Sequence, residues 1–494
     1  MKVVIFADLH LTDSLTSVKN TVLDWAVRTA PETGADAAVC IGDMTAAGTA
    51  GQTARLLTKL QEMPIPFYST PGNAELRRSS AGAEALTILP PEDIPVLLLD
   101  SSRGEPDTAE LAKLAAQPED RGCLLATHCP PEGWSPTAQA VLADAEKRRA
   151  VTEVIAGHTH DDGTRTLRGL DPDKASGGVP MFAVFERLAD GQWTRSDVLM
   201  CGVDPGEWSP KMRQSFLDNL GISGMSWPVE YLQAAAELGI QVFELRSSAV
   251  DNESEEFYQA LKNWRQAGGR MLSLHLPELN AAAEKNSDLE YAAALALRIG
   301  ADRVTLHVPN VTPVEYPVKK TALITEFKRI CGALLENNVQ IGIENLHTQK
   351  GEADENIRHF GCTIAECADW VNTLRKEFDT GLIGFHLDIG HARNNAPYSQ
   401  TDNISDYYCS NDLPINAFHL HQVRQLPDGN FDNHGPLTGL YDKLISLSGL
   451  FMARSGGFFP ADTPMILEIR GAGEGLRSYN CLVDLIKSKK VDER

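Results

Sequence analysis

A recurring unit, a short apolar strand followed by a helical pattern, is the feature that most constrains the fold of this chain. Eight such strand candidates lie between residues 222 and 470: ISGMSW, QVFELR, MLSLHL, RVTLHV, QIGIEN, IGFHLD, NAFHLH and MILEIR. Strands that alternate with helices are typical of a parallel sheet, because each helix returns the chain to the start of the next strand. Eight repeats in roughly 285 residues predict a (β/α)₈ barrel.

The first 200 residues also alternate strands and helices, but they end in a different way. Runs such as KVVIF and AAVCI flank helical patterns at about residues 14–30 and 52–62, which predicts a layered α/β domain. Two final strands, PMFAVFERL and WTRSDVLM, are joined through Asp190 and Gly191, a dipeptide that favours a hairpin turn. We therefore predict two different α/β domains.

The segment GVDPGEWSP, residues 202–210, is rich in Gly and Pro and has no periodicity, so we place the domain boundary there. The predicted organisation is a first domain at 1–201, a linker at 202–212 and the barrel at 213–494. A chain of 494 residues with 43% hydrophobic residues has enough apolar material for two cores.

Composition restricts the partners and the compartment. The chain has 45 basic and 67 acidic residues, and a net charge of −22 disfavours nucleic acid as a partner. Nine cysteines without a Cys-x-x-Cys pair indicate reduced thiols. No apolar run approaches the ~18 residues of a membrane span. We expect a soluble cytoplasmic protein with no membrane partner, and a homo-oligomer is compatible with this sequence.

Polar residues in the first half lie just past predicted strands. They are Asp8, His10, Asp43, Asn73, His128, His158 and His160. The blocks that contain them, ADLH, IGDM, PGNAE, ATHCPP and AGHTH, together resemble the calcineurin-like metallophosphoesterases over nearly all of residues 1–200.

This resemblance implies a site for two divalent metals, Mn, Fe or Zn. Asp8, His10, Asp43 and His160 would hold one metal, and Asp43, Asn73, His128 and His158 the other. Asp43 would be the catalytic carboxylate that bridges both, as two metals about 3.5 Å apart require. The pair would clamp a phosphoryl group and activate a water that attacks phosphorus in line.

The block PGNAE departs from the family at Ala74. The family has a histidine there, which faces the leaving group and helps to protonate it. Such a general acid contributes about 10²–10⁴-fold to rate. Three interpretations stay open: a slow enzyme, an enzyme whose acid comes from elsewhere or whose leaving group needs none, and a domain that binds a phosphate without cleaving it.

The barrel half carries nine polar residues at or just after strand ends, where barrel enzymes keep their chemistry. They are His275, His307, Glu344, Asp388, His391, His419, Asp432, His434 and Glu468. The surrounding words, among them LHLPELN, IGIENLH, FHLDIGHA, FHLHQ, DNHGPLTG and LEIRG, resemble the xylose isomerase-like barrel superfamily over roughly residues 215–485. That superfamily includes sugar and sugar-phosphate isomerases and epimerases as well as endonuclease IV-type repair enzymes.

The resemblance implies one to three divalent metals, Zn or Mn, in the barrel. Glu344, Asp388, His419 and Glu468 match the single-metal set of the epimerases, in which the two glutamates are catalytic and move protons. The other five residues complete the three-metal pattern of the endonuclease branch. His421 is an alternative to His419 as a ligand, and the Asp-x-His pair at 432 and 434 would bind either a metal or sugar hydroxyls.

Two features weigh against DNA repair. Pro277 and Glu278 stand where the endonuclease branch has an aromatic residue that enters the minor groove, and no Lys/Arg stripe is present. We therefore predict a phosphoesterase joined to an isomerase-like barrel, acting on a small phosphorylated carbohydrate. The alternatives are a nucleic-acid phosphodiesterase with an abasic-site barrel, and a non-catalytic, metal-stabilised sensor of a phosphorylated ligand, which Ala74 suggests.

Overall fold

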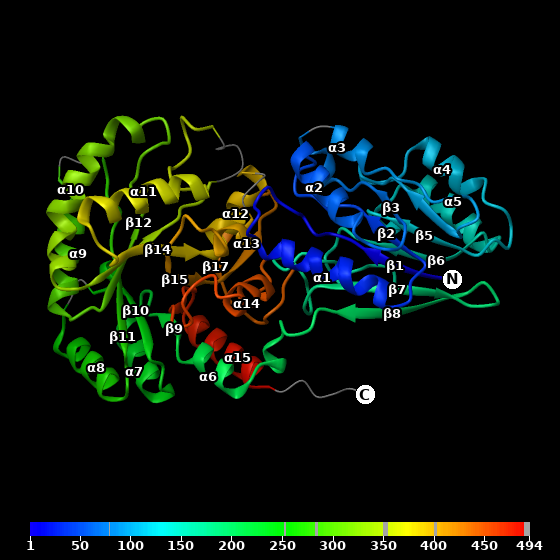
Figure 1. The fold of residues 1–494 in the computed structure, drawn as a ribbon. Coiled ribbons are helices and arrows are strands. Elements are labelled where there is room, and N and C mark those ends of the chain that lie inside the picture. The colour runs from blue at the N-terminus through cyan, green and yellow to red at the C-terminus, as the bar shows by residue number, and fades with distance from the viewer. Residues whose placement is uncertain (79, 251–252, 282–284, 349–353, 400–402, 489–494) are drawn as a thin grey trace. The chain divides into compact units, whose positions relative to one another are not determined.

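The computed structural model of the chain describes residues 1–78, 80–250, 253–281, 285–348, 354–399 and 403–488 (Figure 1). The chain forms two compact units. One comprises Met1–Asp204 with Tyr441–Gly449, and the other Pro205–Leu440 with Leu450–Arg494. The first is a layered α/β domain and the second contains a closed eight-stranded barrel, so the predicted fold class is confirmed.

A five-stranded sheet in the order β3-β2-β1-β7-β8 forms the first layer of the N-terminal unit. Its strands are β1 (Lys2–Phe6), β2 (Ala37–Ile41), β3 (Phe67–Thr70), β7 (Met181–Arg187) and β8 (Trp193–Leu199). β1 is parallel to β2 and antiparallel to β7. The predicted hairpin between β7 and β8 is present, and Gly191 supplies the positive φ of 81° that its turn uses.

A second, three-stranded parallel sheet comprises β4 (Val96–Leu99), β5 (Cys123–Thr127) and β6 (Val151–Ala156). One hydrophobic core joins the two sheets, because residues of the first, such as Ile5 and Val39, cluster with residues of the second, such as Leu98 and Leu124. The two sheets therefore pack face to face.

Helices cover the outer faces of this sandwich. The helices of the unit are α1 (Val18–Glu32), α2 (Ala50–Leu60), α3 (Ser80–Ala85), α4 (Thr108–Ala115) and α5 (Pro136–Lys147). Trp25 of α1 packs on Phe182 of β7, with ring centroids 5.1 Å apart. Leu114 of α4 and Leu142 of α5 belong to a second core with Leu125. The layers are thus helix, sheet, sheet and helix.

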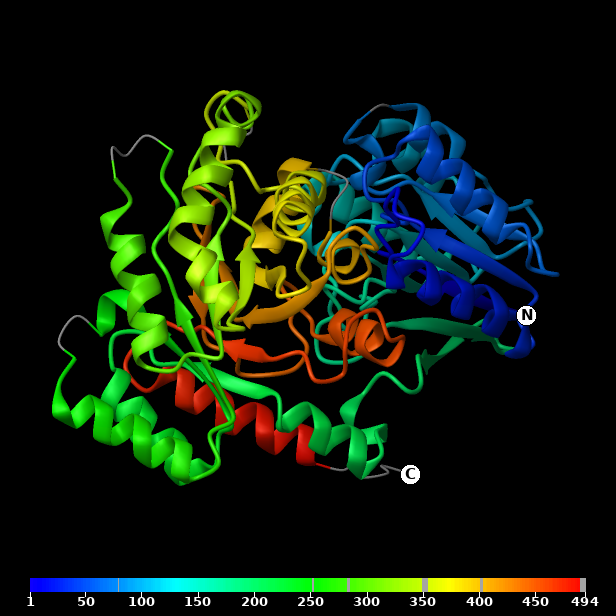
Figure 2. The same ribbon diagram turned by 60° about the vertical axis from the view of Figure 1, so that its left-hand side comes forward.

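The second unit is built on a closed parallel barrel, whose strands are drawn in green to red in Figure 2. The strand order is β10-β11-β12-β13-β14-β15-β18-β9. All eight predicted strands are present: β9 (Leu220–Ser223), β10 (Val242–Arg246), β11 (Met271–His275), β12 (Arg303–His307), β13 (Gln340–Glu344), β14 (Ile383–Asp388), β15 (Ile415–Leu420) and β18 (Met465–Leu467). Each pairs in parallel with its neighbours, so all eight carboxyl ends open at one rim.

Helices surround the barrel strands (Figure 1). They include α7 (Pro228–Leu238), α8 (Glu255–Gln266), α9 (Ser287–Arg298), α10 (Tyr316–Glu336), α11 (Ile364–Phe378), α12 (Ile389–Ser399) and α15 (Glu474–Lys487), with shorter α6 (Pro210–Leu217), α13 (Ile404–Tyr408) and α14 (Ser448–Ser455). In α8, Phe257, Leu261 and Trp264 are buried at helical spacing, and Ser254 caps the first turn.

A two-stranded hairpin, β16 (Gln422–Gln425) and β17 (Phe431–Gly435), follows β15. Its register shifts between Gln422 and Arg424, and His434 on the opposite strand has a positive φ of 61°. Such a bulge re-aims side chains, so the regular alternation of faces is lost there. Across the described parts of both units, no helix combines the length and apolar character that a membrane crossing needs.

Candidate metal centres

The seven candidate ligands of the N-terminal unit follow the carboxyl ends of its strands. Asp8 and His10 follow β1, Asp43 follows β2, Asn73 follows β3, His128 follows β5, and His158 and His160 follow β6. Five of them have a left-handed backbone: Asp8 (53°), His10 (50°), Asp43 (51°), His158 (72°) and His160 (56°). Non-glycine residues in this region cluster at functional sites, where the surrounding structure holds the strained conformation.

The two carboxylate oxygens of Asp43 face two different groups of histidines. Oδ2 lies 3.7 Å from Nε2 of His10, and that nitrogen lies 3.3 Å from Nε2 of His160. Oδ1 lies 3.4 Å from Nε2 of His128. A carboxylate placed in this way has the geometry of a bridge between two cations.

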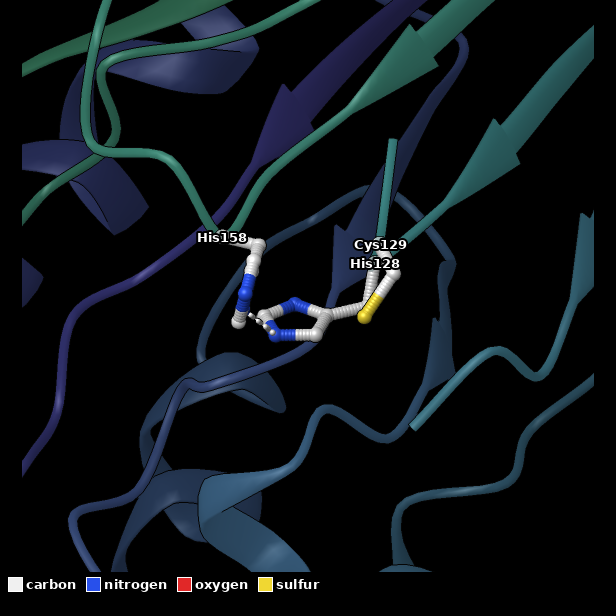
Figure 3. A group of neighbouring side chains, drawn as sticks. All are labelled: His128, Cys129 and His158. Atoms are coloured by element: carbon white, nitrogen blue, oxygen red, sulfur yellow. Dashed lines mark hydrogen bonds between the residues drawn. The ribbon is translucent and has the colours of Figure 1, made fainter. Parts of the chain in front are cut away.

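The second histidine group contains His128 and His158, shown in Figure 3. Nδ1 of His158 lies 3.2 Å from Nε2 of His128, which also lies 3.0 Å from Oδ1 of Asn73. Nδ1 of His128 lies 3.1 Å from the carbonyl oxygen of Ile41. This contact leaves Nε2 directed into the site, as is usual for a histidine ligand.

Cys129 is a neighbour that the sequence did not single out. Its Sγ atom, one ring nitrogen of His128 and one of His158 all lie within 4.8 Å of one another (Figure 3). Burial raises the pKa of the Cys129 thiol to about 11. The only signal in the sequence is its place directly after His128.

Asp8 completes the other group with His10 and His160, since one ligand atom of each lies within 4.8 Å of the others. Both oxygens of Asp8 accept from the backbone N–H of His158, at 3.1 and 2.9 Å. Burial raises the pKa of Asp8 to about 8, although the nearby charge of His128 lowers it. Burial of a charged carboxylate costs free energy, and a divalent cation bound by Asp8 and the neutral imidazoles would offset that cost.

Glu75 organises the loop instead of facing the histidines. Its carboxylate accepts from the backbone N–H groups of Asp43 (2.9 Å), Gly72 (2.8 Å) and Thr45 (2.8 Å). Gly72 has no room for a side chain, because a Cβ there would lie 2.3 Å from Oδ1 of Asp43. Glu75 therefore holds Asp43 in place, a role that the motif PGNAE alone does not specify.

In the barrel, His419 lies at the centre of the predicted ligands. Its Nδ1 atom lies 3.2 Å from Oε1 of Glu344, 3.3 Å from Oε2 of Glu468 and 3.9 Å from Oδ2 of Asp388. All four side chains are buried. One imidazole nitrogen facing three carboxylates is a donor set that fits a single divalent cation.

Glu244 supports His419 from behind, and sequence analysis missed it. Oε1 of Glu244 lies 2.8 Å from Nε2 of His419, while Oε2 accepts from the hydroxyls of Ser273 and Thr305, both at 2.9 Å. Burial opposes the ionisation of Glu244, but the charge of His419 prevails and lowers its pKa to about 2. The only local signal in the sequence is the alternation of side chains along β10, which places Glu244 on the face that points into the barrel.

A second group of candidate ligands adjoins the other carboxylate oxygen of Glu344. Nε2 of His275 lies 3.1 Å, and Nε2 of His307 lies 3.5 Å, from Oε2 of Glu344. Because Oε1 of the same carboxylate faces His419, Glu344 has a separate oxygen for each group.

A third group lies beside Asp388 and contains His391, His421 and His434. Nε2 of His421 lies 3.0 Å from both oxygens of Asp388, and the ring centroids of His421 and His434 are 4.6 Å apart. The structure does not bring Asp432 to this group. Asp432 is partly exposed and forms an ion pair with Arg424 at 2.9 Å. The structure thus brings together the other eight predicted barrel residues and adds His421.

An open pocket of about 250 Å³ lies beside the barrel site. Arg246, Ser247, Ser248, His275, Leu276, Pro277, Glu278 and His307 line it. The guanidinium of Arg246 forms an ion pair with Oε1 of Glu468, so a fixed cation lies between the pocket and the candidate metal ligands.

Two family models match the chain. Residues 1–162 match the calcineurin-like phosphoesterase model, and residues 232–454 match the xylose isomerase-like TIM barrel model. A search of curated proteins found no match.

Solved structures that are similar to this chain include three TIM-barrel proteins. A D-tagatose 3-epimerase-like protein is 17% identical, with 54% of this chain and 97% of that chain covered and a TM-score of 0.39. A protein from Thermus thermophilus, soaked with zinc chloride, is 19% identical (55% and 98% covered, TM-score 0.36). A D-psicose 3-epimerase studied with D-fructose is 14% identical (55% and 95% covered, TM-score 0.35).

Proposed function

We propose that both halves of this chain are metal-dependent enzymes. Residues 1–162 belong to the calcineurin-like phosphoesterase family, and residues 232–454 belong to the xylose isomerase-like TIM barrel family. The N-terminal domain hydrolyses phosphoesters. The barrel isomerises or epimerises a small phosphorylated carbohydrate. One class of substrate would then serve both sites.

The observation that carries the hydrolase proposal is the arrangement of Asp43. Its two oxygens face His10 and His128 at 3.7 and 3.4 Å, as a bridging ligand requires. Two divalent metals held there would polarise a phosphoryl group and supply a nucleophilic water near neutral pH. This reaction requires no nucleophilic side chain. The chain's own part is to position the ligands.

Ala74 restricts the leaving group. It offers no proton, and its side chain is fully buried. We therefore expect aryl phosphodiesters, whose leaving groups need no proton, to react faster than alkyl monoesters.

The test uses the full chain loaded with manganese or zinc, with Asp43→Ala beside it and Glu344→Gln as a barrel control. Hydrolysis of an aryl phosphodiester should disappear in the Asp43 variant and persist in the Glu344 variant. Equal activity in wild type and Asp43→Ala would exclude this domain as the catalyst.

For the barrel, Glu344 and Glu468 flank Nδ1 of His419 at 3.2 and 3.3 Å. Two carboxylates at one site suit a reaction that removes a proton from one carbon and delivers a proton to another carbon or to the opposite face. The adjacent pocket of about 250 Å³ fits a small molecule, and Arg246 supplies a cation for its phosphate.

Solvent deuterium exchange tests this assignment. The wild-type protein should incorporate deuterium into a ketose phosphate, and Glu468→Gln, loaded to the same metal content as wild type, should abolish the incorporation. Failure of wild type to exchange any ketose or ketose phosphate would contradict the isomerase proposal.

Phosphodiester cleavage is a second candidate reaction for the barrel. It is favoured because further histidines extend the set of metal donors beyond the four central residues. His275 and His307 adjoin one end of that set, and His391, His421 and His434 the other. Clusters of several cations suit phosphoryl displacement. Cleavage of abasic DNA, with binding that weakens steeply as salt rises, would place this candidate first.

A further inference from the structure

We propose that His421, in place of Asp432, is the ligand that completes a cation site with Asp388, His391 and His434 at the barrel rim. The resemblance to the endonuclease branch implies Asp432 as a metal ligand of this site, whereas the geometry points to His421. The inference concerns metal content alone, so it is independent of the reaction proposed for the barrel.

The three histidines share one kind of contact, and His421 in addition directs its Nε2 atom at Asp388. Nδ1 lies beside a backbone carbonyl in each case: Asn345 for His391 (3.0 Å), Gln422 for His421 (3.1 Å) and Glu468 for His434 (3.3 Å). A histidine that donates its Nδ1–H to a carbonyl has the lone pair of Nε2 available for a metal, and this outer contact is typical of metal-bound histidines.

His421 has a second hydrogen-bonding choice in the absence of metal. The backbone N–H of His434 lies 3.0 Å from Nδ1 of His421, an arrangement that moves the proton to Nε2, facing Asp388. Binding of a cation at Nε2 requires the other tautomer, in which the proton on Nδ1 is donated to the carbonyl of Gln422 and the backbone N–H of His434 gives up its hydrogen bond to Nδ1.

The three imidazoles lie close to one another and are buried. Their ring centroids are 4.6 Å apart for His421 and His434, 5.9 Å for His391 and His434, and 6.2 Å for His391 and His421. Nε2 of His421 is 3.0 Å from both oxygens of Asp388. His421 and Asp388 are fully buried, and the other two are nearly so.

Gly390 shows that the fold makes room for His421. A Cβ at Gly390, in the first turn of α12, would lie 1.9 Å from Cε1 of His421. Glycine weakens a helix by about 1 kcal/mol relative to alanine, so a helical glycine usually has a packing reason. The reason here is the imidazole of His421.

Asp432 is directed elsewhere by the local backbone. A fully extended Asp-x-His would place Asp432 and His434 on one face, but the positive φ of His434 and the register shift of the hairpin break that alternation. The Asp432 side chain is 43% exposed and is paired with Arg424.

Three imidazoles and one carboxylate favour a borderline cation such as Zn²⁺ over Mg²⁺ or Ca²⁺. Asp388 also faces Nδ1 of His419 at 3.9 Å, so it would be shared with the central ligands.

The experiment measures zinc per chain by elemental analysis in the full-length protein after zinc loading and gel filtration. His421→Ala should hold one zinc fewer than wild type, and Gly390→Ala should show the same loss because it displaces the imidazole. Asp432→Asn is the matched control and should retain the wild-type content. Equal zinc content in wild type and His421→Ala would overturn the proposal.

Anomalous diffraction at the zinc edge of wild-type crystals supplies the second measurement and does not depend on how the variants fold. A peak within bonding distance of Nε2 of His391, His421 and His434 is expected. A peak bound by Asp432 instead of His421, or no peak at this group, would overturn the assignment. If wild-type protein shows this peak but has no isomerase activity, only the proposed function is contradicted.

Discussion

The backbone N–H of Ala74 donates a hydrogen bond of 2.7 Å to Oδ1 of Asp43, the carboxylate that faces both histidine groups of the N-terminal site. Residue 74 therefore serves the site through its backbone N–H, a donor that every residue except proline carries. Because Glu75 holds the same loop through three backbone N–H groups, the site keeps its geometry although the usual imidazole is missing.

Ala74→His should restore a general acid without disturbing the ligands. We expect kcat/KM for alkyl phosphoesters to rise about 10²-fold, because their leaving groups need a proton, while aryl esters change little. Ala74→Leu is the control for bulk, since it fills the buried position without a titratable group and should produce no gain. Thermal melting of both variants checks the fold. An equal gain for aryl and alkyl esters would contradict the role in proton transfer.

Glu244→Gln should weaken metal binding at the centre of the barrel. The carboxylate holds Nε2 of His419 at 2.8 Å, and loss of such an outer partner lowers metal affinity by about 10–100-fold. A metal titration with a competing chelator measures the change. Ser273→Ala removes one hydrogen bond to Glu244 but leaves its contact with His419, so it should have a much smaller effect. Equal losses in both variants would assign the effect to general loosening of the barrel interior.

Arg246→Gln should weaken the binding of phosphorylated ligands. Arg246 lines the pocket and, together with the charge of His419, keeps the pKa of the buried Glu468 well below its usual value. Loss of a charge-assisted hydrogen bond corresponds to about 10–100-fold in Kd, measured by calorimetry with a sugar phosphate. Arg265 of α8 forms an ion pair with Asp302, and Arg265→Gln should leave the Kd unchanged. A matching loss for the unphosphorylated sugar would argue against a phosphate contact.

Lys19→Met should destabilise the N-terminal unit. The ammonium is fully buried, 3.0 Å from each carboxylate oxygen of Asp171 and 3.7 Å from Asp173, so its removal leaves buried charge uncompensated. The expected loss in free energy of unfolding is about 3–5 kcal/mol, measured by chemical denaturation.

Lys59→Met is the matched control for Lys19→Met. Lys59 pairs with Asp24 and Glu62 at the surface, where the loss should stay below about 1 kcal/mol. Similar losses for the two lysines would show that burial of the Lys19 pair does not matter.

The sequence by itself determined the two folds and the edge at which the polar residues gather. Strand and helix periods are local properties, so IGFHLD and NAFHLH can be identified as strands without a structure. In a parallel sheet the residue that ends a strand lies at the same edge as the end of its neighbour. The positions of Asp43, Glu344 and Glu468 at such edges follow from the chain direction alone.

Only the tertiary structure decided which atoms face one another. Glu244 meets His419 across 175 residues, and Gly390 makes room for His421 from a different element, so neither relationship has a local pattern. Asp432 illustrates the same limit at short range. The spacing Asp-x-His places both side chains on one face only in an extended strand, and the positive φ of His434 removes that condition. Hydrogen bonds between distant segments and single backbone dihedrals determine the ligand geometry, and neither is encoded in the period of a sequence.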